Sequence, residues 1–226
     1  KIEIRKRNEL GLLADTFNAM TEGLKKAREA ELQRIALEKE LEIANRIQDS
    51  LLPKSFPDMK RYEAASFYKS AKEIGGDYYD VIALGGHRFG IVIADVSGKG
   101  IPAALIMTML SGILNIEARA NADPVRVMIK LNDTLLTKVS GNMFATVFYA
   151  VLDIDANSVE MVSAGHHEAM VYSAATAAVE NYCPRGAAIG VLKGRAFEER
   201  LEKKTAVIGA GDRLLLFTDG ISDAKA

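Results

Sequence analysis

The chain has 226 residues, 49% of them hydrophobic, which suits one sizeable folded domain with an appendage and excludes an intrinsically disordered chain. Its 29 basic and 30 acidic residues give a net charge of −1, so the overall charge does not favour a nucleic acid or an anionic membrane surface as partner. The single cysteine cannot form an internal disulfide, no run approaches the roughly 20 apolar residues that span a bilayer, and the start lacks a signal-peptide core, so we expect a cytoplasmic chain.

The first predicted element is a long helix from Lys1 to about Leu52. This stretch is rich in Glu, Lys, Arg, Leu and Ala and contains no proline, and Pro53 and Pro57 end it. Apolar residues recur in alternating steps of three and four, which is the pattern of a coiled-coil seam. One seam comprises Leu10, Leu13, Phe17, Met20, Leu24 and Ala27, and a second, offset by three residues, comprises Leu37, Leu41, Ala44 and Leu51. We predict a parallel homodimeric coiled-coil stalk; the alternative is a single amphipathic helix that lies on its own domain.

Beyond Pro57 the pattern changes to short strand-like runs separated by turn residues. The predicted strands are Ala65–Tyr68, Tyr78–Ala83, Arg88–Ala94, Met143–Leu152, Ser158–Ser163, Ala169–Tyr172 and Arg213–Phe217, with a hairpin tip at Ala174–Ala178. Two helices are predicted between them, Ile101–Ala120 and Pro124–Ser140. This order of elements indicates an α+β fold with antiparallel sheets, and it divides the chain into a signalling helix at 1–52 and a folded domain at 58–226.

Three acidic corners carry the chemistry. Gly-Gly-Asp-Tyr-Tyr-Asp at 75–80, Ala-Asp-Val-Ser-Gly-Lys-Gly at 94–100 and Phe-Thr-Asp-Gly at 217–220 each place a carboxylate at a predicted strand end beside glycine. Hard divalent cations prefer oxygen ligands, and glycine lets backbone carbonyls and water approach a small ion. Taken singly, such a corner is more often a turn or a helix cap than a ligand. Three converging corners would form a Mg²⁺ or Mn²⁺ site, which points to hydrolysis rather than redox chemistry.

Together with Ile-Gln-Asp-Ser-Leu-Leu-Pro at 47–53 and Ala-Gly-His at 164–166, these motifs resemble the bacterial PPM (PP2C-like) serine phosphatases of the SpoIIE and RsbU type. The order and spacing match from about Arg46 to Ala226. The resemblance implies a PP2C-like α-β-β-α sandwich with two Mn²⁺ or Mg²⁺ ions at one edge. It also implies a hydrolase that removes phosphate from serine or threonine on a protein substrate.

The resemblance assigns roles by position. It implies that Asp95 bridges both metals and that the backbone carbonyl of Val96 contacts the second ion. Asp77 is implied to act on that second ion, partly through water, and Asp219 to bind the first. Asp77 and Asp95 are thereby the implied catalytic residues, acting through a metal-activated water. Asp80 is expected to cap a turn or to support Asp77 from behind.

The chain departs from the family pattern in two places. The family's last metal ligand belongs to an Asp-Asp pair beyond the position of Ala226, so we expect this chain to lack the domain's C-terminal strand and helix. After Ala-Gly-His the family usually has Asn and Pro, whereas this chain continues with His and Glu. Adjacent histidines on a strand point to opposite faces, so we expect a structural or supporting role for His166 and His167 rather than metal ligation.

The N-terminal part has a resemblance of its own. Residues 8–20 resemble the second helix of a HAMP signal-relay domain. Such domains normally follow a transmembrane helix, which implies that the full-length protein is a membrane-anchored receptor with the phosphatase as its output at the cytoplasmic face. The phosphatase resemblance implies as substrate a phosphorylated STAS-domain anti-sigma antagonist, whose dephosphorylation regulates a sigma factor.

Other families share single features of this chain. Gly-Gly-Asp also begins the diguanylate cyclase signature, but there an acidic residue and phenylalanine follow, whereas here Tyr78 and Tyr79 follow. A histidine kinase needs a phosphoacceptor histidine on its dimeric helix, and no histidine precedes His87. A cysteine phosphatase needs Cys-x5-Arg, but Ile189 stands six residues after Cys183, which we expect to be a small buried residue. The open alternative is a catalytically silent phosphatase fold that binds a phosphoprotein partner.

Overall fold

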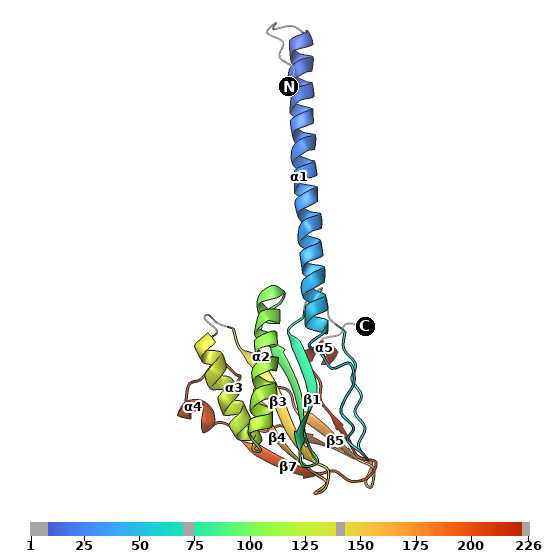
Figure 1. Ribbon diagram of the computed structural model, residues 1–226, viewed down its shortest axis with the longest axis vertical. Coiled ribbons are helices and arrows are strands. Elements are labelled where there is room, and N and C mark those ends of the chain that lie inside the picture. Colours follow the sequence, from blue (N-terminus) through green and yellow to red (C-terminus); the bar gives the residue numbers. More distant parts are fainter. Residues whose placement is uncertain (1–8, 70–74, 139–142, 223–226) are drawn as a thin grey trace. The chain divides into compact units, whose positions relative to one another are not determined.

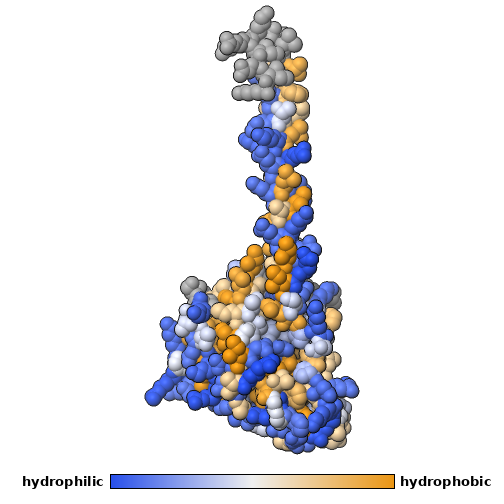
Figure 2. All heavy atoms as spheres, in the orientation of Figure 1, coloured by the Kyte–Doolittle hydropathy of each residue, from blue (hydrophilic) through white to orange (hydrophobic). Residues whose placement is uncertain are grey.

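The computed structural model describes residues 9–69, 75–138 and 143–222 (Figure 1). The chain divides into two compact units, Lys1–Asn45 and Arg46–Ala226. Most of the first unit is the helix α1, Glu9–Asp49, which confirms the predicted long helix; the first eight residues of that prediction lie outside the described part. Within the described part of the first predicted seam, Leu13, Phe17, Met20 and Leu24 are exposed, and Figure 2 shows apolar surface along α1.

Two antiparallel sheets form the second unit. The five-stranded sheet has the order β1-β2-β3-β4-β7 and the three-stranded sheet the order β6-β5-β8. In the first sheet the strands are β1 (Asp77–Gly85), β2 (Arg88–Val96), β3 (Ala145–Asp153), β4 (Ser158–Ala164) and β7 (Lys203–Val207). In the second they are β5 (Ala169–Ser173), β6 (Ala178–Tyr182) and β8 (Arg213–Leu215). The helices are α2 (Ile101–Ala120), α3 (Pro124–Lys138), α4 (Arg195–Glu198) and α5 (Asp219–Ser222).

The two faces of the larger sheet are buried in two different cores. The long helices α2 and α3 cover one face (Figure 1), where Leu110, Leu114 and Leu131 pack with alternate strand residues. The other face packs against the smaller sheet through Phe148, Met161 and neighbouring apolar residues. Because side chains alternate along a strand, each central strand supplies both cores. The predicted α+β sandwich with antiparallel sheets is confirmed. The helices that lie between residues 143 and 222, α4 and α5, are short and have four residues each.

The predicted strands from Tyr78 to Tyr172 are confirmed within a few residues, whereas the predicted Arg213–Phe217 ends early, because β8 stops at Leu215. Ala65–Tyr68 forms no strand: Tyr68 packs its ring against Tyr79 at 6.2 Å between centroids, while Phe67 is exposed. The strands β6 and β7 were not predicted, because these edge strands carry exposed polar residues in place of a clear apolar alternation. The hairpin tip at 174–177 is confirmed, and the predicted end of α3 at Ser140 lies outside the described residues.

Two further expectations are corrected. Helix α2 is long and apolar enough to cross a membrane by length and composition, contrary to the expectation from the sequence. Its buried residues, which include Met107 and Leu110, belong to the core between the helices and the larger sheet, so here it is the core helix of a folded domain. Cys183 is exposed rather than buried, because it follows the edge strand β6.

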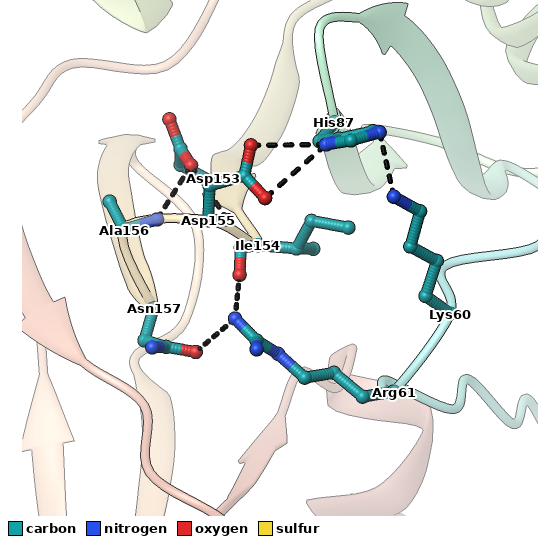
Figure 3. A network of polar contacts seen from close by, with 8 residues as sticks. All are labelled: Lys60, Arg61, His87, Asp153, Ile154, Asp155, Ala156 and Asn157. Carbon is teal, nitrogen blue, oxygen red and sulfur yellow. Dashed lines mark hydrogen bonds and ion pairs between the residues drawn. The ribbon is translucent and has the colours of Figure 1, made fainter.

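An extended segment between α1 and β1 is held by polar contacts where it turns (Figure 3). Lys60 Nζ lies 2.7 Å from His87 Nε2, and the other ring nitrogen lies 3.0 Å from Asp155 Oδ2. Arg61 donates to the carbonyl of Ile154 and, at 2.8 Å, to Asn157 Oδ1. These contacts join three separate turns of the chain.

Candidate metal centre

Asp77 and Asp95 face each other on adjacent strands. Asp77 begins β1 and is the register partner of Asp95, which lies one residue before the end of β2. The next strand adds Thr146, the register partner of Asp95. Directly paired residues point to the same side of a sheet, so all three side chains lie on the face toward the smaller sheet. The β1–β2 and β2–β3 pairings therefore bring the first two predicted corners together.

The third corner reaches the same place from the C-terminal end. Thr218 Oγ1 donates a hydrogen bond to Asp77 Oδ2 at 3.1 Å. The next residue, Asp219, begins α5, and its charge acts on both Asp77 and Asp95. The structure thus joins the third corner to the first through the contact of Thr218 with Asp77.

Both carboxylates of the pair have pKa values above their ordinary range. Burial, together with the charges of Asp77 and Asp219, raises the pKa of Asp95 to about 7, and Lys99 opposes this only in part. Burial also raises the pKa of Asp77, while its hydrogen bonds from Thr218 and Asp95 lower it. Close carboxylates with raised pKa values are a sign of a functional site, since a structural role would normally supply a positive partner.

The surroundings of the pair fit a small divalent cation. A Cβ added to Gly76 would lie 2.8 Å from the carbonyl oxygen of Val96 and 3.5 Å from Asp95 Oδ1, so only glycine leaves these oxygens open. Val96 in turn donates its amide to the carbonyl of Gly76 at 3.3 Å, which fixes the corner. Carboxylate and carbonyl oxygens are the donors that Mg²⁺ and Mn²⁺ prefer. Within the described residues no three His, Cys, Asp or Glu side chains are close enough to cage a metal, so the fit rests on the carboxylate pair and the carbonyl beside it.

A glutamine fixes the approach to this corner. Gln48, which is 3% exposed, donates its side-chain amide to the carbonyl of Gly75 and accepts from the Gly75 amide at 3.2 Å. Both backbone groups of the residue two places before Asp77 are therefore held. Gln48 could not be singled out from the sequence beyond its place in the motif at 47–53.

The structure places Asp80 away from the pair. Its carboxylate accepts from Tyr78 Oη at 3.0 Å and from Asn115 Nδ2 of α2 at 3.3 Å. Because successive residues of β1 point to opposite faces and Asp80 lies three residues after Asp77, Asp80 lies on the helix side of the sheet, whereas Asp77 lies on the other side. The expectation that Asp80 caps a turn or supports Asp77 is wrong; it belongs to a polar cluster between β1 and α2.

The two histidines lie in the loop between β4 and β5 rather than on a strand. Their rings are 5.6 Å apart, so the expectation of opposite faces is wrong. His166 is 7% exposed and contacts Thr146 and the carbonyl of Phe217, while the ring of His167 stacks on that of Phe217. Burial, with the charge of His167, lowers the pKa of His166 to about 4. Thr146 is a site residue that the sequence did not reveal, because a threonine inside a strand carries no signal of its own.

Comparison with known proteins supports the resemblance to the SpoIIE and RsbU type of phosphatase. Residues 85–226 match the family model of stage II sporulation protein E (SpoIIE). The chain is 31% identical over 192 residues to the phosphoserine phosphatase RsbU of Bacillus subtilis, covering 84% of this chain and 55% of RsbU. It spans 38–55% of the length of the curated relatives it matches.

Solved structures share the fold. The RsbU and RsbW domains of a Mycobacterium tuberculosis protein match with a TM-score of 0.58 and 28% identity, over 69% of this chain and 42% of that one. The SiaA-PP2C domain of Pseudomonas aeruginosa matches with a TM-score of 0.64 and 16% identity, over 83% and 73% of the two chains, which shows likeness of fold alone. The motifs, the paired carboxylates at the sheet edge and the family match together show that the chain belongs to the SpoIIE family of PP2C-like, RsbU-type phosphatases.

Proposed function

We propose that this protein is a metal-dependent phosphatase that removes phosphate from serine or threonine on a protein substrate. The observation that carries the proposal is the pairing of Asp77 with Asp95, two close carboxylates whose pKa values are raised, beside the open carbonyl of Val96. Two Mn²⁺ or Mg²⁺ ions, when bound, would activate water and offset the charge that grows on the phosphoryl oxygens.

The chain's own residues would bind and orient in this mechanism. Asp95, Asp77 and the carbonyl of Val96 would hold the ions, with Asp219 as a further ligand from the C-terminal corner. Thr218 fixes the rotamer of the Asp77 carboxylate through its 3.1 Å hydrogen bond. Metal ligands that are themselves hydrogen-bonded keep their geometry when the ion exchanges. The proposed mechanism needs no nucleophilic side chain, because the water activated by the metal ions would attack the phosphate.

We further propose that this phosphatase is the output of a membrane-anchored signalling receptor and acts at the cytoplasmic face. Its substrate class is a phosphorylated STAS-type antagonist in sigma factor regulation, in keeping with the named activity of RsbU. The HAMP-like sequence at 8–20 supports the receptor half of this proposal. The exposed apolar seam of α1 supports a homodimer, since two such seams would cover each other.

The test is Mn²⁺-dependent hydrolysis of p-nitrophenyl phosphate and of a phosphoserine protein by the full-length protein that contains this sequence, as wild type and as Asp95→Asn. Asp133→Asn, which alters an exposed carboxylate on α3, is the matched control. We expect turnover in the wild type and the control and a loss of about 100-fold or more in Asp95→Asn. A folded wild-type protein without turnover at saturating Mn²⁺ would refute the enzyme and favour the silent phosphoprotein-binding module.

A further inference from the structure

One buried histidine links the strand half of the candidate site to its C-terminal half. His166 Nδ1 lies 2.8 Å from Thr146 Oγ1 on β3, and its Nε2 lies 3.1 Å from the carbonyl oxygen of Phe217. Its backbone is held as well, because the amide donates to Ser163 Oγ and the carbonyl accepts from the same hydroxyl, both at 3.1 Å. All four polar groups of His166 thus have partners. The ring is fixed between two segments, at Thr146 and at Phe217, that lie 71 residues apart in the sequence (217 − 146).

The partners determine which ring nitrogen carries the proton. A carbonyl oxygen can only accept, so Nε2 must donate to Phe217. In the neutral ring Nδ1 then accepts, and the hydroxyl of Thr146 donates to it. The hydroxyl has a second acceptor, the carbonyl of Asp95, but at 3.5 Å this contact is the weaker one.

Together with the strand pairings, these contacts form a closed series of residues that includes the carboxylate pair. Fixing the carbonyl of Phe217 fixes the next residue, Thr218, which donates to Asp77. Asp77 is the register partner of Asp95, and Asp95 is the register partner of Thr146. Thr146 in turn contacts His166, which completes the series. Each of the strand pairings is part of a ladder, whereas the contact of His166 with Phe217 stands outside any ladder.

The C-terminal corner depends on this contact for its position. Strand β8 ends at Leu215, so among the residues that the structure describes no strand pairs with the backbone of 216–218. Leu216 packs against the core between the sheets, and beyond it the corner is held by the hydrogen bond from His166, by the ring of His167 stacked on Phe217 at 5.9 Å, and by Thr218 itself. A shift of this segment would move Thr218 and Asp219 together, away from the carboxylate pair.

We propose that His166 is the positioning residue of this site: by holding the Phe217 carbonyl against β3, it keeps Thr218 and Asp219 beside Asp77 and Asp95. The position of the C-terminal corner then sets the affinity of the site for a divalent cation. The second half of this inference rests on the proposed function; the first half does not. A histidine that merely fills space would have the same burial but would not depend on which nitrogen is replaced.

Replacing His166 by glutamine or by asparagine distinguishes a positioning role from a role in packing alone. The amide nitrogen of glutamine in His166→Gln can reach the place of Nε2 and still donate to the Phe217 carbonyl. Asparagine in His166→Asn reaches only the place of Nδ1, so it keeps the contact with Thr146 and loses the one with Phe217. Both variants remove the ring and its contact with His167, so a role in packing alone would affect both.

The first measurement is amide hydrogen exchange in the metal-free protein. We expect exchange in the segment 217–221, which contains the hydrogen bond from the Ile221 amide to the Thr218 carbonyl, to rise about tenfold or more in His166→Asn and to stay within about threefold of wild type in His166→Gln. The second is the Mn²⁺ dissociation constant, from electron paramagnetic resonance of free Mn²⁺, which we expect to rise about 10- to 100-fold in His166→Asn and less than about threefold in His166→Gln.

Equal behaviour of the two variants in both measurements would overturn the positioning role, whether both resemble wild type or both are impaired along with thermal stability. If wild type binds Mn²⁺ and the two variants bind it equally, this inference fails while the proposed function stands. If wild type binds no Mn²⁺, the second half of this inference and the proposed function both fail. Exchange in the metal-free protein then decides the first half alone.

Discussion

Replacing Asp95 by asparagine should stabilise the metal-free protein while removing its affinity for metal. Ionised Asp95 is held near two other carboxylates, and burial and those charges raise its pKa from 3.8 to about 7. A pKa that is raised in the folded state means that the folded protein binds more protons than the unfolded chain between these two values. The contribution of Asp95 to stability is therefore fully present below about pH 4 and is lost as the pH rises to about 7.

The magnitude follows from the same shift. At face value the shift corresponds to about 4 kcal/mol, and screening of this half-buried carboxylate by water reduces it to about 1–2 kcal/mol. We therefore expect the difference in free energy of unfolding between Asp95→Asn and wild type to be about 1–2 kcal/mol more favourable to the variant at pH 8 than at pH 4. For a domain of this size that is about 2–8 °C in melting temperature.

The assay is urea and thermal unfolding in EDTA at pH 4, 5, 6, 7 and 8, with Asp133→Asn as the control that should follow wild type at every pH. Saturating Mn²⁺ should reverse the order at pH 8, since only wild type gains binding energy, about 2.7 kcal/mol at 100 times the dissociation constant. Parallel pH profiles for wild type and Asp95→Asn in EDTA would show that the carboxylates do not repel each other in the fold, and the electrostatic reasoning would be wrong.

Three further substitutions test the structure by urea unfolding. Tyr149→Phe should leave stability unchanged or raise it by up to about 1 kcal/mol, because the buried hydroxyl finds no hydrogen-bond partner among the described residues; a loss above that size would show a partner. Gly90→Ala should cost about 1–3 kcal/mol, since the new Cβ would lie 2.6 Å from Tyr149 Oη, and the cost should shrink in the Tyr149→Phe background. Asp80→Ala should cost about 1–3 kcal/mol because it leaves the buried hydroxyl of Tyr78 one partner short, yet Mn²⁺ affinity measured by calorimetry should stay within about threefold of wild type. Loss of metal binding in Asp80→Ala would show that Asp80 does contribute to the candidate metal centre.

The candidate site could be predicted to the extent that its residues lie in distinctive local motifs. Asp77 and Asp219 each stand beside glycine at the start of an element, Asp95 lies three residues before Gly98 at the end of β2, and the strand ladder brings Asp77 and Asp95 face to face. Thr146 and the contact of His166 with Phe217 could not be predicted, because they depend on which strands become neighbours and on the path of a loop. These are tertiary contacts with no local signature.

The fold shows the same division between local and tertiary information. Strands buried on both faces, such as β3, have apolar runs that mark them in the sequence, and the helix α2 was predicted at the residues where it occurs. Edge strands gain their hydrogen bonds from a neighbour rather than from their own composition, so β7, with its two lysines, was missed. The side of the sheet on which Asp80 lies depends on register, and a guess from its proximity to Asp77 in the sequence could not supply it.

The halves of the site are far apart along the chain, and this sets the order in which they can form. Asp77 and Asp95 meet in one hairpin, whereas the hydrogen bond from Thr218 to Asp77 closes a loop of 141 residues. Contacts of such long range form late in folding, since the entropy of the intervening chain opposes them until most of the domain is in place. A bound ion should therefore slow unfolding and leave the folding rate nearly unchanged. In this protein a bound metal would make the folded domain kinetically more stable without acting as a nucleus for its folding.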